Sequence, residues 1–172
     1  MKKTIYLVLL IGIFSIFSFA QTREPSKPIR DYIVKTKQQV SDIEKALGKE
    51  NKVEDLIGGE GMQLRVAIQH DKKKDSATAE VHDASDDVFY VLEGSAELTL
   101  GGKLENPREA TPGEWKSEKI IGGKTFTIKK GDLIIVPRGT PHQRINTKGK
   151  TFSLILIKIF AEPLPAPKPK SE

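Results

Sequence analysis

The stretch GDLIIVPRGTPHQRIN, residues 131–146, decides the fold of this chain. Its fixed points are Gly131, Pro137, Gly139, His142 and Asn146, spaced as G-x5-P-x-G-x2-H-x3-N. The apolar run after Gly131 indicates a buried strand. Pro137 has a locked φ and Gly139 can take a positive φ, which predicts a tight reversal that returns the chain to the sheet. His142 then opens the next strand, where alternation places His142 and Asn146 on one face.

An upstream segment brings further polar side chains at strand spacing. Glu80 and His82 lie two residues apart, so they project to the same side of a strand. Asp87 follows His82 after four residues, on what we expect to be the neighbouring strand, and Gly94 follows after six more. The donor side chains of Glu80, His82 and Asp87 can therefore converge from this segment.

The rest of the region from Met62 to Phe160 has a period of two, in short runs bounded by Gly, Pro, Asp and Lys. Val88–Leu92 is apolar on both faces, which predicts an inner strand covered on each side. Seven or more short strands without βαβ alternation predict an all-β sandwich or barrel.

The two segments together resemble the two motifs of the cupin superfamily, whose usual first motif is G-x5-H-x-H-x3-4-E-x6-G. The second motif matches at every fixed position of residues 131–146, and Phe89–Gly94 is similar to the strand of the first. The resemblance covers roughly Met62 to Phe160. It implies an antiparallel jelly-roll (cupin) barrel with a central cavity.

The resemblance also implies a metal site at Glu80, His82, Asp87 and His142. Three positions depart from the family pattern: Glu80 replaces the first His, Asp87 replaces Glu, and Lys74 occupies the place of the opening Gly. Two imidazoles and two carboxylates suit one divalent transition metal, Fe, Mn, Zn or Ni. Asp87 is shorter than Glu, so it binds directly, through water, or not at all.

Two functions follow from this pocket. In the first, the metal supports oxygenase, isomerase or decarboxylase-like chemistry on a small molecule, as the resemblance implies. In the second, a degenerate cupin binds a sugar or organic acid without metal, and Glu80 pairs with Arg65 or Arg144. The sequence leaves open whether the protein is an enzyme, and metal content discriminates the two.

Arg144 and Phe89 are the candidate substrate-binding residues. If Arg144 faces inward beside His142, its cation suits a carboxylate or phosphate; a bulge would turn it to solvent instead. Phe89 would form an apolar wall or ordinary packing. We expect His70 to be a solvated hairpin residue without a role, and regard residues 83 and 86, both Asp, as nearby substitutes for position 87.

The N-terminus indicates export. Lys2 and Lys3 precede an apolar run that closes at Ala20, which predicts a signal peptide over 1–20 and no stable membrane anchor after cleavage. The alternative is an uncleaved membrane anchor, but the apolar run is shorter than the roughly 20 residues that a membrane span needs. The mature protein is then periplasmic or secreted.

Three other regions surround or interrupt the barrel. Residues 21–61 form an extension that contains a short predicted helix, Asp42–Leu47. A capping box at Ser41 and Glu44 indicates where the helix begins, and Gly48 indicates where it ends. Residues 161–172 form a disordered Pro/Lys tail. The long connection 101–123 is either a flap over the barrel mouth or a segment that covers a sheet edge or a dimer contact.

Composition excludes several classes of function. The absence of Cys excludes disulfides, thiolate metal sites and cysteine nucleophiles. The net charge of +5 falls to +3 without Lys2 and Lys3, too weak to argue for nucleic acid binding. A small molecule is the expected partner, and the resemblance is compatible with a homodimer.

N-terminal sequencing of the exported form is expected to begin near Gln21, because signal peptidase reads the small residues that precede it. An intact Met1 would contradict the predicted cleavage.

Overall fold

The computed structural model describes residues 25–28, 30–48, 51–72, 78–148 and 150–164. The chain divides into two compact units, 1–32 and 33–172. In the first unit, the described residues form neither helix nor strand. The predicted signal peptide and Lys74 lie outside the described residues.

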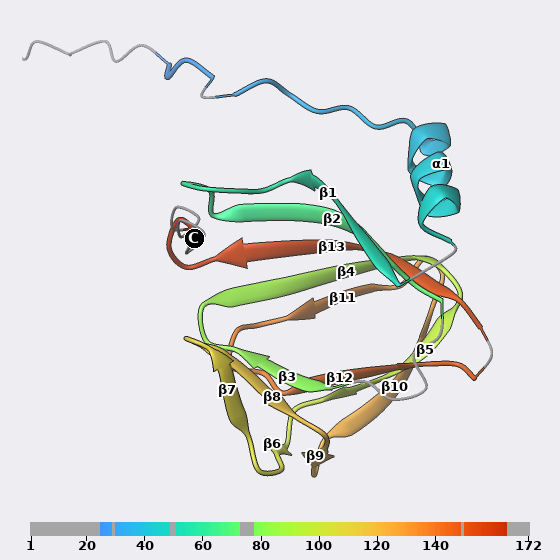
Figure 1. Cartoon of the computed structure of the whole chain (residues 1–172), viewed down its shortest axis with the longest axis vertical. Helices are drawn as coiled ribbons and strands as arrows, with labels where there is room; N and C mark the ends of the chain where they lie inside the picture. Colours follow the sequence, from blue (N-terminus) through green and yellow to red (C-terminus); the bar gives the residue numbers. More distant parts are fainter. Residues whose placement is uncertain (1–24, 29, 49–50, 73–77, 149, 165–172) are drawn as a thin grey trace, which may run out of the picture. The chain divides into compact units, whose positions relative to one another are not determined.

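The second unit contains two large antiparallel sheets (Figure 1). The five-stranded sheet has the order β1-β2-β13-β4-β11, with strands Lys52–Ile57, Leu64–Asp71, Phe152–Phe160, Ser85–Glu93 and Leu133–Val136. The six-stranded sheet has the order β10-β5-β12-β3-β8-β7, with strands Lys124–Lys129, Ser95–Leu100, His142–Asn146, Ala79–His82, Glu114–Ser117 and Arg108–Thr111. A third, two-stranded sheet pairs β6 (Lys103–Leu104) with β9 (Ile120–Ile121). The predicted all-β antiparallel jelly-roll architecture is confirmed.

The hydrophobic core consists of the inward-facing positions of these strands. Alternate side chains of β4, β5 and β13 supply most of it, as the period of two requires. The buried residues of the cluster are Phe89, Val91, Ala96, Leu98, Ile128, Val136, Phe152, Leu154 and Leu156.

Strand β4 corrects one expectation. It is an inner strand between β13 and β11, as predicted. It is buried on one face only, however, because its side chains alternate and Tyr90, on the other face, is 43% exposed. Apolar residues on both faces of Val88–Leu92 therefore do not mean that both faces are covered.

The helix α1 (Lys37–Leu47) is longer than the predicted Asp42–Leu47. Its capping box is formed by Thr36 and Gln39, whose side chains bond reciprocally to each other's backbone N–H, so the helix begins five residues earlier. Gly48 follows the last helical residue as predicted. No helix within the described ranges is long and apolar enough to cross a membrane.

The regions on either side of the barrel are more ordered than the sequence suggested. Strand β1 lies in the predicted extension and pairs with β2 along the edge of the five-stranded sheet. At the other end of the chain, Leu164 exchanges backbone hydrogen bonds with Met62 and Gly61, so the predicted tail is anchored at least to residue 164.

The long connection 101–123 forms strands and not a flap. Its strand β8 pairs with β3 and covers what would otherwise be an edge of the six-stranded sheet, with Trp115 opposite Val81. This agrees with the alternative interpretation, in which the segment covers a sheet edge.

Gly94 ends the first motif in a left-handed conformation that favours glycine. Its φ is +81°, and a Cβ atom would lie 2.1 Å from the carbonyl oxygen of Thr151. We expect Gly94→Ala to lower the free energy of unfolding by at least about 3 kcal/mol, from strain and overlap together, as measured by denaturant unfolding.

Gly131 offers a matched control. Its φ is also positive, +90°, but a Cβ atom there would meet nothing within 4 Å. Gly131→Ala is expected to cost only about 1–2 kcal/mol of backbone strain. Equal losses in the two variants would contradict the steric argument for Gly94.

Candidate metal centre

A cavity of about 190 Å³ lies between the two large sheets. All four predicted metal ligands line it, together with both candidate substrate-binding residues. The complete lining is Gln69, Thr78, Glu80, His82, Asp87, Phe89, His142, Arg144, Leu156 and Lys158.

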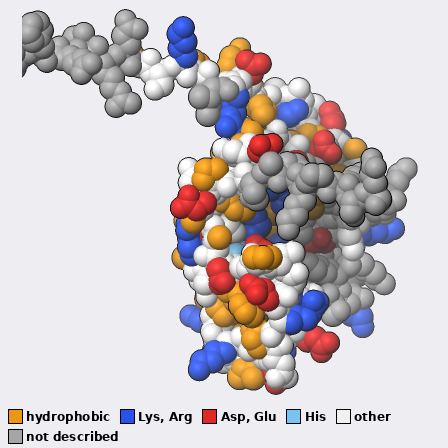
Figure 2. Space-filling model, turned by 60° about the vertical axis from the view of Figure 1, so that its left-hand side comes forward, with side chains coloured by type: hydrophobic (Ala, Val, Ile, Leu, Met, Phe, Trp, Pro, Cys, Tyr) orange, Lys and Arg blue, Asp and Glu red, His pale blue; other side chains and the backbone are white. Residues whose placement is uncertain are grey.

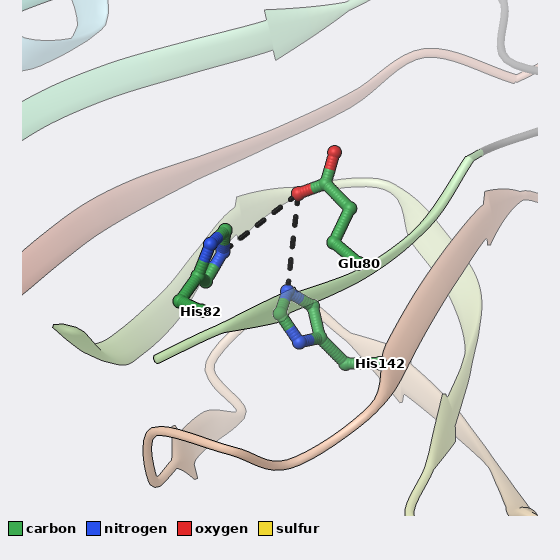
Figure 3. Close-up of side chains that lie close together, drawn as sticks. All are labelled: Glu80, His82 and His142. Carbon is green, nitrogen blue, oxygen red and sulfur yellow. Dashed lines mark ion pairs between the residues drawn. The ribbon is translucent and has the colours of Figure 1, made fainter. Parts of the chain in front are cut away.

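Strand register brings three of these side chains together. His142 on β12 is the cross-strand partner of Glu80 on β3, and His82 lies two residues further along β3. Figure 3 shows the three side chains pointing toward one another. Glu80 Oε2 lies 3.8 Å from His82 Nε2 and 4.0 Å from His142 Nε2, and the two rings are 5.0 Å apart between centroids. One ligand atom from each residue falls within 4.8 Å of the others.

The predicted reversal fixes this arrangement. Gly139 takes a φ of +77°, and its N–H donates to the backbone carbonyl of His82 at 2.8 Å. The N–H of Arg138 donates to Asp86 Oδ1, also at 2.8 Å. The predicted tight reversal before His142 is thus observed, and the structure adds that it is tied to the end of β3.

Asp87 lies beside the three residues. Its Oδ2 is 3.4 Å from His82 Nε2 and 3.9 Å from His142 Nε2, while its Oδ1 accepts from Lys158 Nζ at 2.8 Å. Only one oxygen of Asp87 is therefore directed toward the histidines. Its two suggested substitutes have other partners: Asp86 pairs with Arg138, and Asp83 accepts from Trp115 Nε1.

The two carboxylate oxygens of Glu80 also have different partners, like those of Asp87. Its Oε1 accepts from Lys116 Nζ at 2.5 Å, and its Oε2 faces the imidazoles. The alternative pairing of Glu80 with Arg65 or Arg144 is wrong, because both arginines pair with other carboxylates.

Each imidazole is oriented by a contact at its Nδ1 atom, on the side of the ring away from Nε2. His82 Nδ1 lies 2.6 Å from Glu114 Oε2, and His142 Nδ1 lies 3.1 Å from the carbonyl oxygen of Thr140. Carbonyl and carboxylate oxygens only accept, so Nδ1 is the donor in each ring, and in the neutral ring the lone pair is on Nε2. Such an outer partner is typical of a metal-binding histidine.

The residues present fit a divalent transition metal. The Nε2 of His82 is buried and has no hydrogen-bond partner in the part of the chain that is described. Buried polar atoms are normally satisfied, so an orphan beside two carboxylate oxygens and a second imidazole indicates a site for a ligand. Two imidazole nitrogens and two carboxylate oxygens form a donor set for such an ion.

The electrostatic environment shifts the pKa values of His82 and His142 in opposite directions. Burial alone would lower the pKa of His82, but Asp87 and Glu114 outweigh it and raise this pKa. Burial lowers the pKa of His142. For Glu80 and Asp87, burial would raise the pKa, but each carboxylate's lysine and the histidines lower it below its usual value. Both carboxylates are therefore ionised at neutral pH.

The candidate substrate-binding residues both face the cavity. Arg144 is buried and points inward, with Nη2 donating to Asp71 Oδ2 at 2.6 Å, so the outward bulge is not observed. Phe89 is 4% exposed and forms part of the cavity wall.

The expectation for His70 is wrong. His70 is 8% exposed because β2 continues to Asp71 and pairs with β13, which places His70 opposite Ser153 in the sheet. Neither ring nitrogen has a hydrogen-bond partner among the residues described.

Sequence reasoning missed Glu114, Lys116 and Lys158. The first two come from β8, where they flank Trp115 and lie on the same face of the sheet as their cross-strand partners in β3, His82 and Glu80. Their alternation was a signal for a strand, but the length of the connection suggested a loop. Lys158 comes from near the end of β13, opposite Asp87.

Comparisons with known proteins agree with this architecture. A family model described as Cupin domain matches residues 116–158. A Bacillus halodurans structure is 18% identical with a TM-score of 0.51, covering 81% of this chain and 88% of its own. An uncharacterized protein with a double-stranded β-helix domain from Klebsiella pneumoniae is 17% identical with a TM-score of 0.50, covering 77% and 92%.

A third structure, the cupin domain of Cnp3 from Schizosaccharomyces pombe, is 19% identical with a TM-score of 0.46. The match covers 63% of this chain and 64% of that one, slightly less than two thirds of its length. No curated protein matches the chain. The fold is a double-stranded β-helix, that is, the cupin fold. The family match within residues 116–158 and the shared fold both agree with the resemblance to cupins.

We expect Glu114→Gln to lower the pKa of His82, because the variant removes an anion 2.6 Å from Nδ1 that helps to raise it. NMR titration of the imidazole signals measures this change. The pKa of His142, whose Nδ1 partner is a backbone carbonyl, is expected to change much less. An unchanged pKa of His82 would contradict the assigned contact.

Proposed function

We propose that this chain is an exported protein that binds one divalent metal ion through Glu80, His82 and His142, with Asp87 as an adjacent donor, and acts on a small molecule. One observation carries the proposal. His82 Nε2 is buried and has no hydrogen-bond partner among the described residues, and the oxygens of Glu80 and Asp87 lie within 4 Å of it. Leaving such a group unsatisfied costs about 1–3 kcal/mol, which a bound ion would recover.

The surrounding residues would prepare the ligands. Glu114 and Thr140 orient the two rings, while Lys116 and Lys158 each bind one oxygen of a carboxylate and leave the other for the ion. A bound ion would supply Lewis-acid catalysis by polarising a substrate oxygen, in an oxygenase, isomerase or decarboxylase-like reaction.

A second candidate is a metal-free binding module for a small acid or sugar. The ion pairs of both candidate carboxylates with lysine favour it, because Glu80 and Asp87 already have cationic partners without an ion. The two candidates share the cavity and differ in metal content.

Metal analysis of the purified mature protein separates them. We expect about one divalent ion per chain in the wild type and a large loss in His82→Ala and His142→Ala, because each variant removes an imidazole ligand. His70→Gln is the matched control, since His70 is the one remaining histidine of the sequence and does not line the cavity. It should retain the ion.

A wild-type protein without metal after reconstitution would overturn the metal proposal and favour the binding module. Equal loss of metal in all three variants would also contradict it, because the effect would then be one of folding.

A further inference from the structure

We propose that the Arg144 end of the cavity is a subsite for a carboxylate of a short dicarboxylic acid, which is the substrate class of the proposed function and rests on it. The metal ligands and Arg144 line the same cavity. In the space-filling view, histidine and basic side chains are visible near the middle of the face shown (Figure 2). The substrate's second carboxylate would lie at the metal end.

The guanidinium of Arg144 is fixed and incompletely satisfied. Its side chain is 9% exposed, Nη2 is bound by Asp71, and its Cζ lies 5.8 Å and 5.1 Å from the ring centroids of Phe89 and Phe152. Its Nε has no hydrogen-bond partner in the described ranges of the chain. An immobilised arginine that lines a cavity and has an N–H donor without a described partner is suited to a planar carboxylate.

The charges around the cavity also favour an anion. The lining charges and their partners form three pairs of opposite sign, which are Lys116–Glu80, Lys158–Asp87 and Arg144–Asp71. The three pairs balance, and Glu114, 2.6 Å from His82 Nδ1, adds one negative charge, so a divalent ion would leave one uncompensated positive charge in a largely buried space. Buried net charge is costly, and the carboxylate of an anionic ligand would neutralise it.

The small size of the cavity favours an acid with a short chain. About 190 Å³ corresponds to about six water molecules at about 30 Å³ each. This is below the roughly 300–1,000 Å³ of pockets for drug-sized ligands. Phe89 and Leu156 supply apolar wall for a methylene group, and Gln69 and Thr78 supply additional polar groups.

Calorimetric titration of the zinc-loaded mature protein with malonate tests the subsite. Malonate is expected to bind, and its neutral analogue malonamide to bind at least about tenfold more weakly. Arg144→Lys keeps the charge opposite Asp71 but removes the forked donor, so we expect malonate affinity to fall about tenfold or more while zinc stoichiometry is unchanged.

Arg138→Lys is the matched control. Arg138 also pairs with an aspartate, Asp86, but it does not line the cavity, so malonate affinity should not change. If Arg144→Lys does not fold, Asp71→Asn replaces it, because this near-isosteric change removes the negative charge that competes with a bound carboxylate for Arg144. Malonate should then bind more tightly.

Equal binding of malonate and malonamide would overturn the subsite, as would unchanged malonate affinity in Arg144→Lys or no gain in Asp71→Asn. The proposed function would survive these results, because zinc binding is measured separately. A wild-type chain that takes up no zinc would instead overturn the proposed function.

Discussion

The pairing of β12 with β3, in which His142 lies opposite Glu80, is the constraint on which the site depends. Side chains alternate along both strands, so this register determines that Glu80, His82, His142 and Arg144 all face the cavity. A slip of one residue would turn the residues of one strand to its other face. The hydrogen bond from Gly139 to the carbonyl of His82 fixes the register at the point where β12 begins.

The electrostatics of the site depend on strands that the two motifs do not contain. Strand β8 supplies the outer partners of both β3 ligands, Glu114 for His82 and Lys116 for Glu80. Strand β13 supplies Lys158 for Asp87. The extra pairing at the edge of the six-stranded sheet therefore has a chemical role as well as a structural one, because it sets the orientation and charge of the ligands.

Local geometry explains which features could be predicted from the sequence. The reversal before His142 and the shared face of β12 follow from backbone preferences and alternation, and both are observed. The partners of Glu80 and Asp87 could not be predicted, because Lys116 and Lys158 are 36 and 71 residues away and meet them only through the sheet order. His70 was misplaced for the same reason: the charged residues around it suggested a hairpin, whereas pairing with β13 extends the strand.

The helix start shows the limit of local signals themselves. Residues 36–39 and 41–44 both carry a capping-box pattern, and the sequence contains no local feature that ranks one above the other. The upstream box is the one formed, and the downstream pattern lies within α1. Its Glu44 instead accepts a hydrogen bond from the Ser153 hydroxyl on β13, a contact that depends on tertiary structure.

The division of each carboxylate between a lysine and the histidines bears on the order of folding and assembly. A site built from bare carboxylates repels itself until an ion arrives, and such a protein folds together with its metal. Here Lys116 and Lys158 already pair with the two carboxylates in the folded chain. The folded barrel therefore does not need an ion to relieve repulsion between Glu80 and Asp87, and any ion would bind at a site that is already formed.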